Sequence, residues 1–391
     1  MAGKEKPYTL YRGGRAKGPL RPLREQAEPR RERDGYRRDD GRRRVVPRRW
    51  RRMLVLALVG AVLLALVWAL LGFLAVRRGV AQANDRLSER ARAALAAPAG
   101  SILTNATNTL VLGADVGGKR PDRQGIGRSD SIMLVRTDPD EHRLAYLSIP
   151  RDLRVEIPGH GVDKINAAYS LGGPALATRT VRALTGLRVN HVVVVDFSGF
   201  REVIDAIGGI TIDNPKPVLS NPFDCPFTGA EACAEKFKGW RFRKGEIHLD
   251  GRRALIYSRI RKNQLNPSES DITRGERQQR VLQGLADKVV SLYGYLHMPF
   301  IGDDLVNPLA TDLSAGQLLQ LAWVRRRAAA DKTLRCRLGG TPTTIGGIDY
   351  LQSSEDNVRV VDMIRNRDSA AQPPAPGDPF APGCFVGRAR G

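Results

Sequence analysis

The chain of 391 residues lacks the motifs on which several common enzyme classes depend. It has five histidines, and none stands at the spacing of a metal-binding motif, which argues against a histidine-metal enzyme. It contains no Gly-x-Ser-x-Gly and no Gly-x-x-x-x-Gly-Lys followed by Ser or Thr, which argues against a serine hydrolase of that type and against a P-loop NTPase. Positive charge, by contrast, is in excess, with 63 lysines and arginines against 41 acidic residues.

One segment lacks charge altogether. Residues 53–76 form a run of 24 uncharged residues, about 36 Å long as a helix at about 1.5 Å per residue. A bilayer core is about 30 Å thick, so the run predicts a transmembrane helix with some tilt. A cleaved signal peptide is the alternative, because Ala81-Gln82-Ala83 resembles a cleavage site. The apolar run and the tail before it are long for such a peptide.

The positive charge lies mainly on one side of this run. Residues 1–52 hold 19 lysines and arginines and seven acidic residues, which is +12 of the net +22. Only Arg77 and Arg78 follow the run closely, so the positive-inside rule predicts a single-pass protein of the cell membrane with residues 1–52 in the cytoplasm and the rest outside the cell. A basic chain also raises nucleic acid as a partner. The position of the charge beside the apolar run favours a membrane instead.

Cysteine is scarce, and all four cysteines follow the predicted membrane helix. An even number outside a membrane is typical of disulfides, and we predict the pairs Cys225–Cys233 and Cys336–Cys384. A metal ion held by four thiolates is the alternative, which the absence of Cys-x-x-Cys disfavours.

Composition divides the chain into a basic, disordered tail, a membrane helix, a short helical stalk, a compact domain, an extension packed on that domain and a flexible Pro- and Gly-rich tail. In the compact domain, short runs rich in β-branched residues stand among helical patterns, which predicts an α/β layered fold around a central sheet. The six parts are residues 1–52, 53–76, 77–104, 105–292, 293–368 and 369–391. The expected strands are 109–114, 131–135, 143–149 and 191–195, with another at 333–338; the helices are 165–171, 174–185, 197–207, 251–260, 273–292, 314–329 and 354–366.

An arginine-rich segment carries the clearest chemical signal. Arg259 and Arg261 are two residues apart, and Asp271, Arg274 and Gln278 follow at three- and four-residue steps. Arg274 and Gln278 share one helix face, which apolar residues continue, so this polar end points inward. Buried arginines need an anion, and a guanidinium matches phosphate oxygens in pairs. We predict an oxyanion pocket for phosphate. For Asp271 alone, capping of the helix is the competing role.

Two aspartates stand where predicted strands meet a Gly- and Arg-rich loop. Asp115 ends the first strand and Asp130 opens the second. Mg²⁺ typically takes one or two carboxylates plus substrate oxygens, so the pair could hold Mg²⁺ against a pyrophosphate. A turn or cap role is the alternative for each. Arg151 and Asp152 follow the next strand, where a salt-bridged turn is the alternative to ligand binding. Lys164 and Asn166 open a helix and are secondary candidates for anion binding.

Several segments, taken in order over residues 108–292, resemble the LytR–CpsA–Psr (LCP) proteins of the bacterial cell envelope. They are LVLGAD, GRSDSI, SIPRD, DKINAAYSLGG, VDFSGF, DAIGGI and the run ALIYSRIRK–SDITRGERQQ. The resemblance implies a central mixed β-sheet flanked by helices in an α-β-α arrangement. The sequence departs from the family at Leu153, where Thr or Ser is usual, and at Arg120, which lies farther from the first aspartate than the family's arginine.

The resemblance also implies an activity, namely transfer of a glycopolymer from a polyprenyl-pyrophosphate carrier to peptidoglycan, aided by Mg²⁺ or alternatively Mn²⁺. By motif, Asp115 and Asp130 match the metal-associated carboxylates, and Asp115 or Asp271 is the candidate acceptor of the hydroxyl proton. The candidate catalytic residues are Asp115, Asp271, Arg151, Arg259 and Arg274, and the expected pyrophosphate contacts are Arg128, Arg151, Arg259, Arg261, Arg274 and Gln278.

Two other functions fit parts of the same sequence. A hydrolase that cleaves the carrier pyrophosphate without transfer needs the same arginines and metal. A non-enzymatic envelope protein that binds polyanions, or regulates through nucleic acid, fits the basic tail. We do not expect nucleic acid as a partner of the outer domain, which has no aromatic RNA-binding stretch and no helix-turn-helix pattern.

Overall fold

The computed structural model describes residues 48–97, 100–115, 127–267, 269, 271–365, 372–375 and 378–387. Most of the predicted basic tail, the loop at 116–126 with Arg120, and the side chains of Arg128 and Asp271 lie outside the described residues. Residues 59–391 form one compact unit, and every contact reported below lies within it.

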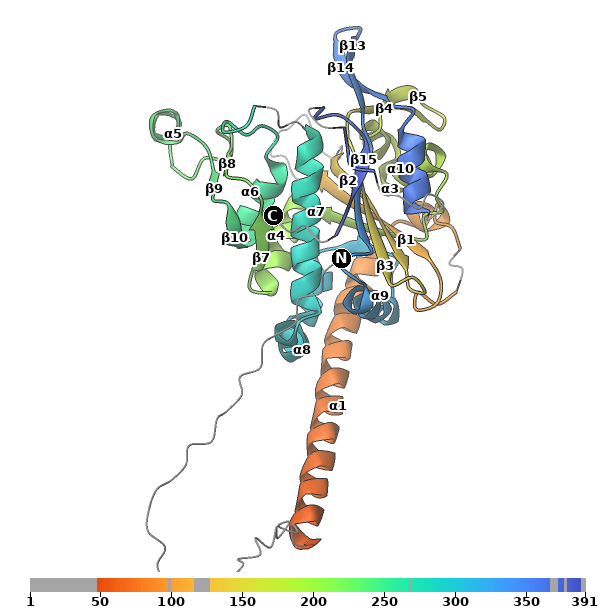
Figure 1. Cartoon of the computed structure of the whole chain (residues 1–391), viewed down its shortest axis with the longest axis vertical. Helices are drawn as coiled ribbons and strands as arrows, with labels where there is room; N and C mark the ends of the chain where they lie inside the picture. Colours follow the sequence, from red (N-terminus) through yellow and green to blue (C-terminus); the bar gives the residue numbers. More distant parts are fainter. Residues whose placement is uncertain are drawn as a thin grey trace, which may run out of the picture. The chain divides into compact units, whose positions relative to one another are not determined.

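A seven-stranded sheet forms the centre of this unit (Figure 1). Its pairing is mixed, since β1 runs parallel to β6 and antiparallel to β2, while β3 runs antiparallel to β2 and parallel to β12. The predicted mixed α/β fold is confirmed. In order across the sheet the strands are β11 (Ala310–Thr311), β6 (His191–Asp196), β1 (Thr107–Asp115), β2 (Arg128–Asp138), β3 (Arg143–Ile149), β12 (Thr333–Arg337) and β15 (Gly383–Val386).

Alternate side chains of each strand point to opposite faces of the sheet, so both faces carry apolar side chains. Helices cover both faces. Leu110 and Leu112 of β1 pack in one core with α3 (Ala167–Thr185) and α10 (Asn357–Ile364). Between them in sequence, Val111 packs on the other side in a core with α7 (Asp271–Val289) and α9 (Ala315–Arg327). α3 is kinked at Gly172 and Gly173, between the two helical patterns that the sequence predicts there.

A further core lies beside α7. It joins α4 (Phe197–Ala206), α6 (Gly251–Arg259), α8 (Leu292–Val306) and the two-stranded antiparallel sheet of β7 (Ile210–Asn214) and β10 (Gly245–Leu249). The sequence did not predict this strand pair or the 15-residue helix α8. It also did not predict several short elements, because few residues form each pattern. These are β4 (Leu153–Ile157), β5 (Gly161–Lys164), β8 (Val218–Leu219), α5 (Ala230–Lys236), β9 (Arg241–Phe242), β11, β13 (Gly340–Ile345), β14 (Ile348–Ser353) and β15.

The N-terminal helix α1 (Arg48–Asp85) is longer than the predicted membrane segment. Among the described residues it is the one helix long and apolar enough to cross a membrane. Beyond the apolar run, Val80 and Ala83 of α1 are buried in the core beside α7, and Ala91 of α2 (Glu89–Ala93) is buried against α3. The residues expected to form a stalk therefore pack on the domain, because the apolar side chains in this stretch share its cores.

The part of the chain after residue 292 completes the fold. β11, β12 and β15 all belong to the central sheet. The sheet therefore includes residues beyond Leu292, where the sequence predicted the catalytic domain to end. A disulfide joins Cys336 of β12 to Cys384 of β15, and a second joins Cys225 to Cys233. Both predicted disulfides are confirmed.

Candidate active site

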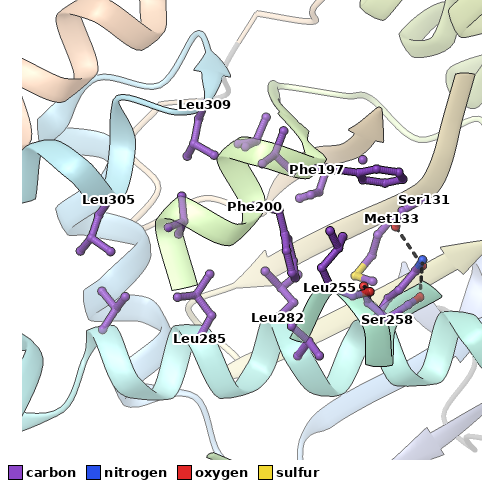
Figure 2. Close-up of a pocket in the computed structure, with 18 of the residues that line it drawn as sticks. Ser131, Met133, Phe197, Phe200, Leu255, Ser258, Leu282, Leu285, Leu305 and Leu309 are labelled. Carbon is purple, nitrogen blue, oxygen red and sulfur yellow. Dashed lines mark hydrogen bonds between the residues drawn. The ribbon is translucent and has the colours of Figure 1, made fainter. Parts of the chain in front are cut away.

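A cavity of about 1440 Å³ lies between the sheet and the helices on the α7 side. Pockets for small molecules usually measure about 300–1,000 Å³, so this one suits a larger ligand. Figure 2 shows its apolar walls, which β2, α4, α6, α7, α8 and the residues before β11 supply. Labelled there are Met133, Phe200, Leu255, Leu282, Leu285, Leu305 and Leu309.

The cavity becomes polar and basic at one end. Five residues predicted as pyrophosphate contacts line it, from three separate segments of the chain. They are Arg151, Arg259, Arg261, Arg274 and Gln278. Asp130, Ser131, Ser258 and Lys262 line the cavity with them, and Lys262 had not been predicted from the sequence.

Arg274 and Gln278 lie one turn apart on α7 and share one face, as their spacing predicts, and this face meets β2. Arg274 is buried, and its guanidinium donates to the backbone carbonyl of Asp130 at 2.6 Å. The Gln278 amide accepts from the Ser131 hydroxyl at 2.9 Å and donates to the Ser258 carbonyl at 3.3 Å (Figure 2). One helix face therefore ties the start of β2 to the end of α6.

Arg151 connects two carboxylates just beyond the end of β3. Its guanidinium lies 2.6 Å from the Asp130 carboxylate and 3.3 Å from that of Asp152. Lys164, which we expected as a secondary anion contact, instead pairs with Asp152 at 3.0 Å. The salt-bridged turn and the ligand site are thus compatible, because Arg151 also lines the cavity.

Arg259, at the end of α6, has a partner that the sequence did not predict. It forms an ion pair with Asp224, which stands next to the disulfide-bonded Cys225 in the insertion between β8 and β9. Its guanidinium also lies 4.7 Å from the ring centre of Phe197 and 5.6 Å from that of Phe223. Aromatic faces attract such cations and limit their freedom.

Arg277 fixes the loop that carries the arginine pair. It is buried, lies 2.6 Å from the Glu269 carboxylate and donates to the Ile260 carbonyl at 2.6 Å. It therefore ties the residues just after Arg259 to α7. The run Arg274–Arg280 is rich in arginine, so Arg277 was visible in the sequence as one more candidate for anion binding. Only its contacts with the loop show that it positions the loop and does not bind the ligand.

The groups whose pKa is perturbed lie away from the cavity. Burial raises the pKa of Tyr257, whose hydroxyl donates to the Asn214 side chain at 2.9 Å. Burial lowers the pKa of Arg335 and of Arg337, and nearby Glu276 opposes both shifts. None of the three lines the cavity, so these perturbations come from the packing of the fold.

The two predicted metal-associated aspartates lie at the same end of neighbouring strands. β1 pairs with β2 such that Ala114 is opposite Ser129, with a register shift beside Gly113 that leaves Asp130 at the irregular point. Asp130 lines the cavity and Asp115 does not. Within the part of the chain that the structure describes, no three acidic, histidine or cysteine side chains form a complete metal site. Two carboxylates still fit Mg²⁺, because substrate oxygens usually supply the remaining ligands.

A family model described as the LytR_cpsA_psr family matches residues 75–367. The chain belongs to the LytR–CpsA–Psr family. Among curated LCP relatives, a polyisoprenyl-teichoic acid–peptidoglycan teichoic acid transferase, TagU of Oceanobacillus iheyensis, is 33% identical over 264 residues, which cover 66% of this chain and 74% of the relative. TagU of Enterococcus faecalis is 32% identical over 66% of this chain and 79% of its own.

Solved LCP structures share the fold. The crystal structure of Bacillus subtilis TagV has a TM-score of 0.56 and 27% identity, covering 68% of this chain and 97% of TagV. The structure of TagT bound to LIIa-WTA has a TM-score of 0.53 and 26% identity, covering 69% of this chain and 93% of TagT.

Proposed function

We propose that this protein is a membrane-anchored transferase that moves a glycopolymer from a polyprenyl-pyrophosphate carrier to peptidoglycan, outside the cytoplasm. Its TagU relatives are named as transferases of teichoic acid from a polyisoprenyl carrier to peptidoglycan. The observation that carries the proposal is the cavity, which is apolar over most of its length and lined by arginines at one end.

That arrangement matches the two ends of the carrier. A polyprenyl chain is hydrocarbon and gains about 0.8 kcal/mol for each CH₂ group that it buries. A diphosphate carries permanent negative charge, which Arg151, Arg259 and Arg274 neutralise with hydrogen bonds of the strong, charge-assisted kind. Two carboxylates and a carbonyl hold these guanidinium groups in place. The site is therefore preorganised for an anion.

The reaction needs positioning and charge neutralisation more than a covalent nucleophile, because the diphosphate already provides a good leaving group. A hydroxyl of the acceptor attacks the phosphorus next to the glycan. The new P–O bond forms as the bond to the bridging oxygen breaks, and polyprenyl phosphate leaves. The hydroxyl proton passes to a carboxylate, Asp115 or Asp271. The arginines hold the diphosphate and stabilise the charge that develops on the leaving phosphate.

We also propose Mg²⁺, or Mn²⁺ in its place, as the metal of this site. Asp115 and Asp130 would hold it, and their hard oxygen donors suit either ion. When bound, the ion neutralises charge on the diphosphate oxygens.

The orientation follows from charge and is also part of the proposal. The basic block before α1 supports a cytoplasmic N-terminus under the positive-inside rule. Two disulfides in the domain support an oxidising compartment for residues 77–391. The acceptor named for the TagU relatives, peptidoglycan, lies on that side of the membrane.

A transfer assay with purified protein, polyprenyl-pyrophosphate glycan and peptidoglycan tests the function. Arg259→Ala and Arg274→Ala should each lower polymer attachment by about 100-fold or more, the scale of losing one charge-stabilising donor. Arg359→Ala, an exposed arginine on α10, is the matched control and should leave attachment unchanged. Unchanged attachment by both site variants would remove these residues from catalysis. Free glycan phosphate without attachment by the wild type would instead indicate a hydrolase.

A further inference from the structure

Helix α8 carries an apolar face that the described part of the chain leaves largely exposed. Leu292, Leu296 and Phe300 are 71%, 48% and 71% exposed. They recur every four residues, so they share one side of the helix. The opposite side is buried, with Gly302 and Leu305 in the core region. A monomeric protein in water rarely leaves such a contiguous apolar surface exposed.

This helix packs along α1, as Figure 1 shows. The Tyr295 hydroxyl donates to the Ala65 carbonyl at 3.1 Å, and the rings of Trp68 and Phe300 meet edge to face with centres 5.7 Å apart. These contacts fall within the uncharged run of α1 rather than beyond it.

Glycines bring the two helices close together. A Cβ added at Gly72 would lie 3.2 Å from Met298, and one added at Gly302 would lie 3.0 Å from Val76. Small residues at a helix contact are characteristic of packing between helices in membranes, where backbones approach closely. α8 is therefore held against α1 at two levels, near Ala65 and near Val76.

The position of Ala65 gives the depth of α8. Ala65 lies 11 residues before Val76, the last residue of the uncharged run, which is about 16 Å along a helix. If α1 spans a bilayer of about 30 Å, the start of α8 lies below the level at which α1 leaves the hydrocarbon. Its exposed leucines and Phe300 then face lipid rather than water.

α9 extends the same surface. Leu319 and Trp323 are exposed on it, and the Arg327 guanidinium lies 5.9 Å from the Trp323 ring centre. Tryptophan followed by arginine is typical of the boundary between hydrocarbon and headgroups, where the ring and the cation each find their preferred surroundings.

The same three helices also line the cavity, and exposed Trp323 belongs to both the outer surface and the cavity wall. Trp68 and Gly72 of α1, Tyr295 of α8 and Trp323 of α9 are all part of its wall. We propose that α8 and the start of α9 lie in the outer leaflet beside α1, and that the cavity opens among these helices, so that the carrier lipid enters sideways from the bilayer. This inference rests on the proposed function.

The energetics favour such a route. Each CH₂ group drawn from lipid into water costs about 0.8 kcal/mol. A long polyprenyl chain that crossed water to reach the cavity would meet a prohibitive barrier. We choose the bilayer as the occupant of the apolar face, rather than a second copy of the chain, because the face continues the uncharged surface of α1 at the same level.

Spin labels in the full chain, reconstituted in lipid nanodiscs, test the location of α8. A label at Leu296→Cys should relax more with oxygen than with a water-soluble nickel chelate. Val162→Cys is the matched control, since Val162 is 51% exposed on β5 and away from α8, and its label should respond mainly to the chelate. A chelate response at position 296 equal to that at 162 would overturn the proposal.

Transfer assays test the route. Leu292→Glu with Leu296→Glu changes the lipid-facing side without altering a cavity residue. Transfer from a donor embedded in a bilayer should fall at least tenfold, while transfer from a short-chain donor soluble in water should not change. Val358→Glu, an exposed apolar residue on α10, should affect neither. Equal effects on both donors, or none on either, would overturn sideways entry. Failure of the wild type with both donors would instead overturn the proposed function.

Discussion

At the residue level, Arg259 is held by a partner that a diphosphate can replace. Asp224 pairs with it from the insertion between β8 and β9, and both side chains are partly open to solvent. An ion pair of this kind is worth little in water, because solvent screens it. Asp224 can therefore keep Arg259 in position and still be replaced by a diphosphate, which binds the guanidinium more strongly.

Asp224→Asn should tighten binding of polyprenyl pyrophosphate by about two- to fivefold, the range for loss of one exposed competing pair. Titration calorimetry with the detergent-solubilised full chain measures the change. Asp356→Asn, which removes a similarly exposed pair with Arg359 on α10, should leave binding unchanged. Weaker binding by Asp224→Asn would mean that the aspartate orders the site rather than competes for it.

The carboxylates at the ends of β1 and β2 give a second prediction. Removing divalent metal with a chelator should lower transfer, and added Mg²⁺ or Mn²⁺ should restore it. Asp115→Asn and Asp130→Asn should each raise the Mg²⁺ concentration needed for half-maximal activity, because a neutral amide binds the ion less well. Full activity in chelator would exclude the metal role of both residues.

At the level of elements, α7 presents Arg274 and Gln278 only because it approaches β3 closely. Gly275 permits this approach, since a Cβ at that position would lie 2.1 Å from the Ser148 hydroxyl. Ser148 belongs to the segment that leads into Arg151. This contact between α7 and β3 therefore helps to position both Arg274 and Arg151 at the basic end of the cavity.

Gly275→Ala should destabilise the domain by about 1–3 kcal/mol, as overpacking of a well-packed interior does, and should also lower transfer. Thermal unfolding followed by circular dichroism measures the first effect. Gly316→Ala in α9 is the matched control, because its Cβ would meet nothing nearer than Ser314 at 4.0 Å. Adding Ser148→Ala to Gly275→Ala should recover part of the lost stability. No loss in Gly275→Ala would show that α7 can move away without cost.

The sequence predicted the elements whose signal is local. β3 is a run of seven buried residues, and β1 ends at Asp115, as the sequence predicts. The i, i+4 spacing of Arg274 and Gln278 likewise gave their common face. The partner of Arg259 could not be predicted, because Asp224 lies 35 residues away in an insertion with no periodic pattern. Nor could the sequence reveal that Trp68, in the membrane run, forms a wall of the site, since this depends on how α8 folds back along α1.

At the level of the whole molecule, the proposed orientation can be tested in intact cells. A tag after residue 391 should be accessible to added protease or antibody, and a tag before Met1 should become accessible only after the membrane is permeabilised. The reason is the basic block before α1, which resists translocation. The reverse pattern of protection would contradict the orientation and, with it, the transfer to an acceptor outside the cytoplasm.

The part played by α1 in the cavity wall bears on how such proteins are studied. Trp68, Ala69, Gly72, Phe73 and Val76 enclose one flank of the chamber. A water-soluble fragment without α1 would lack this part of the cavity wall. A long hydrocarbon chain would be exposed to solvent there, so affinities measured with such fragments would underestimate the affinity of the intact enzyme for its carrier.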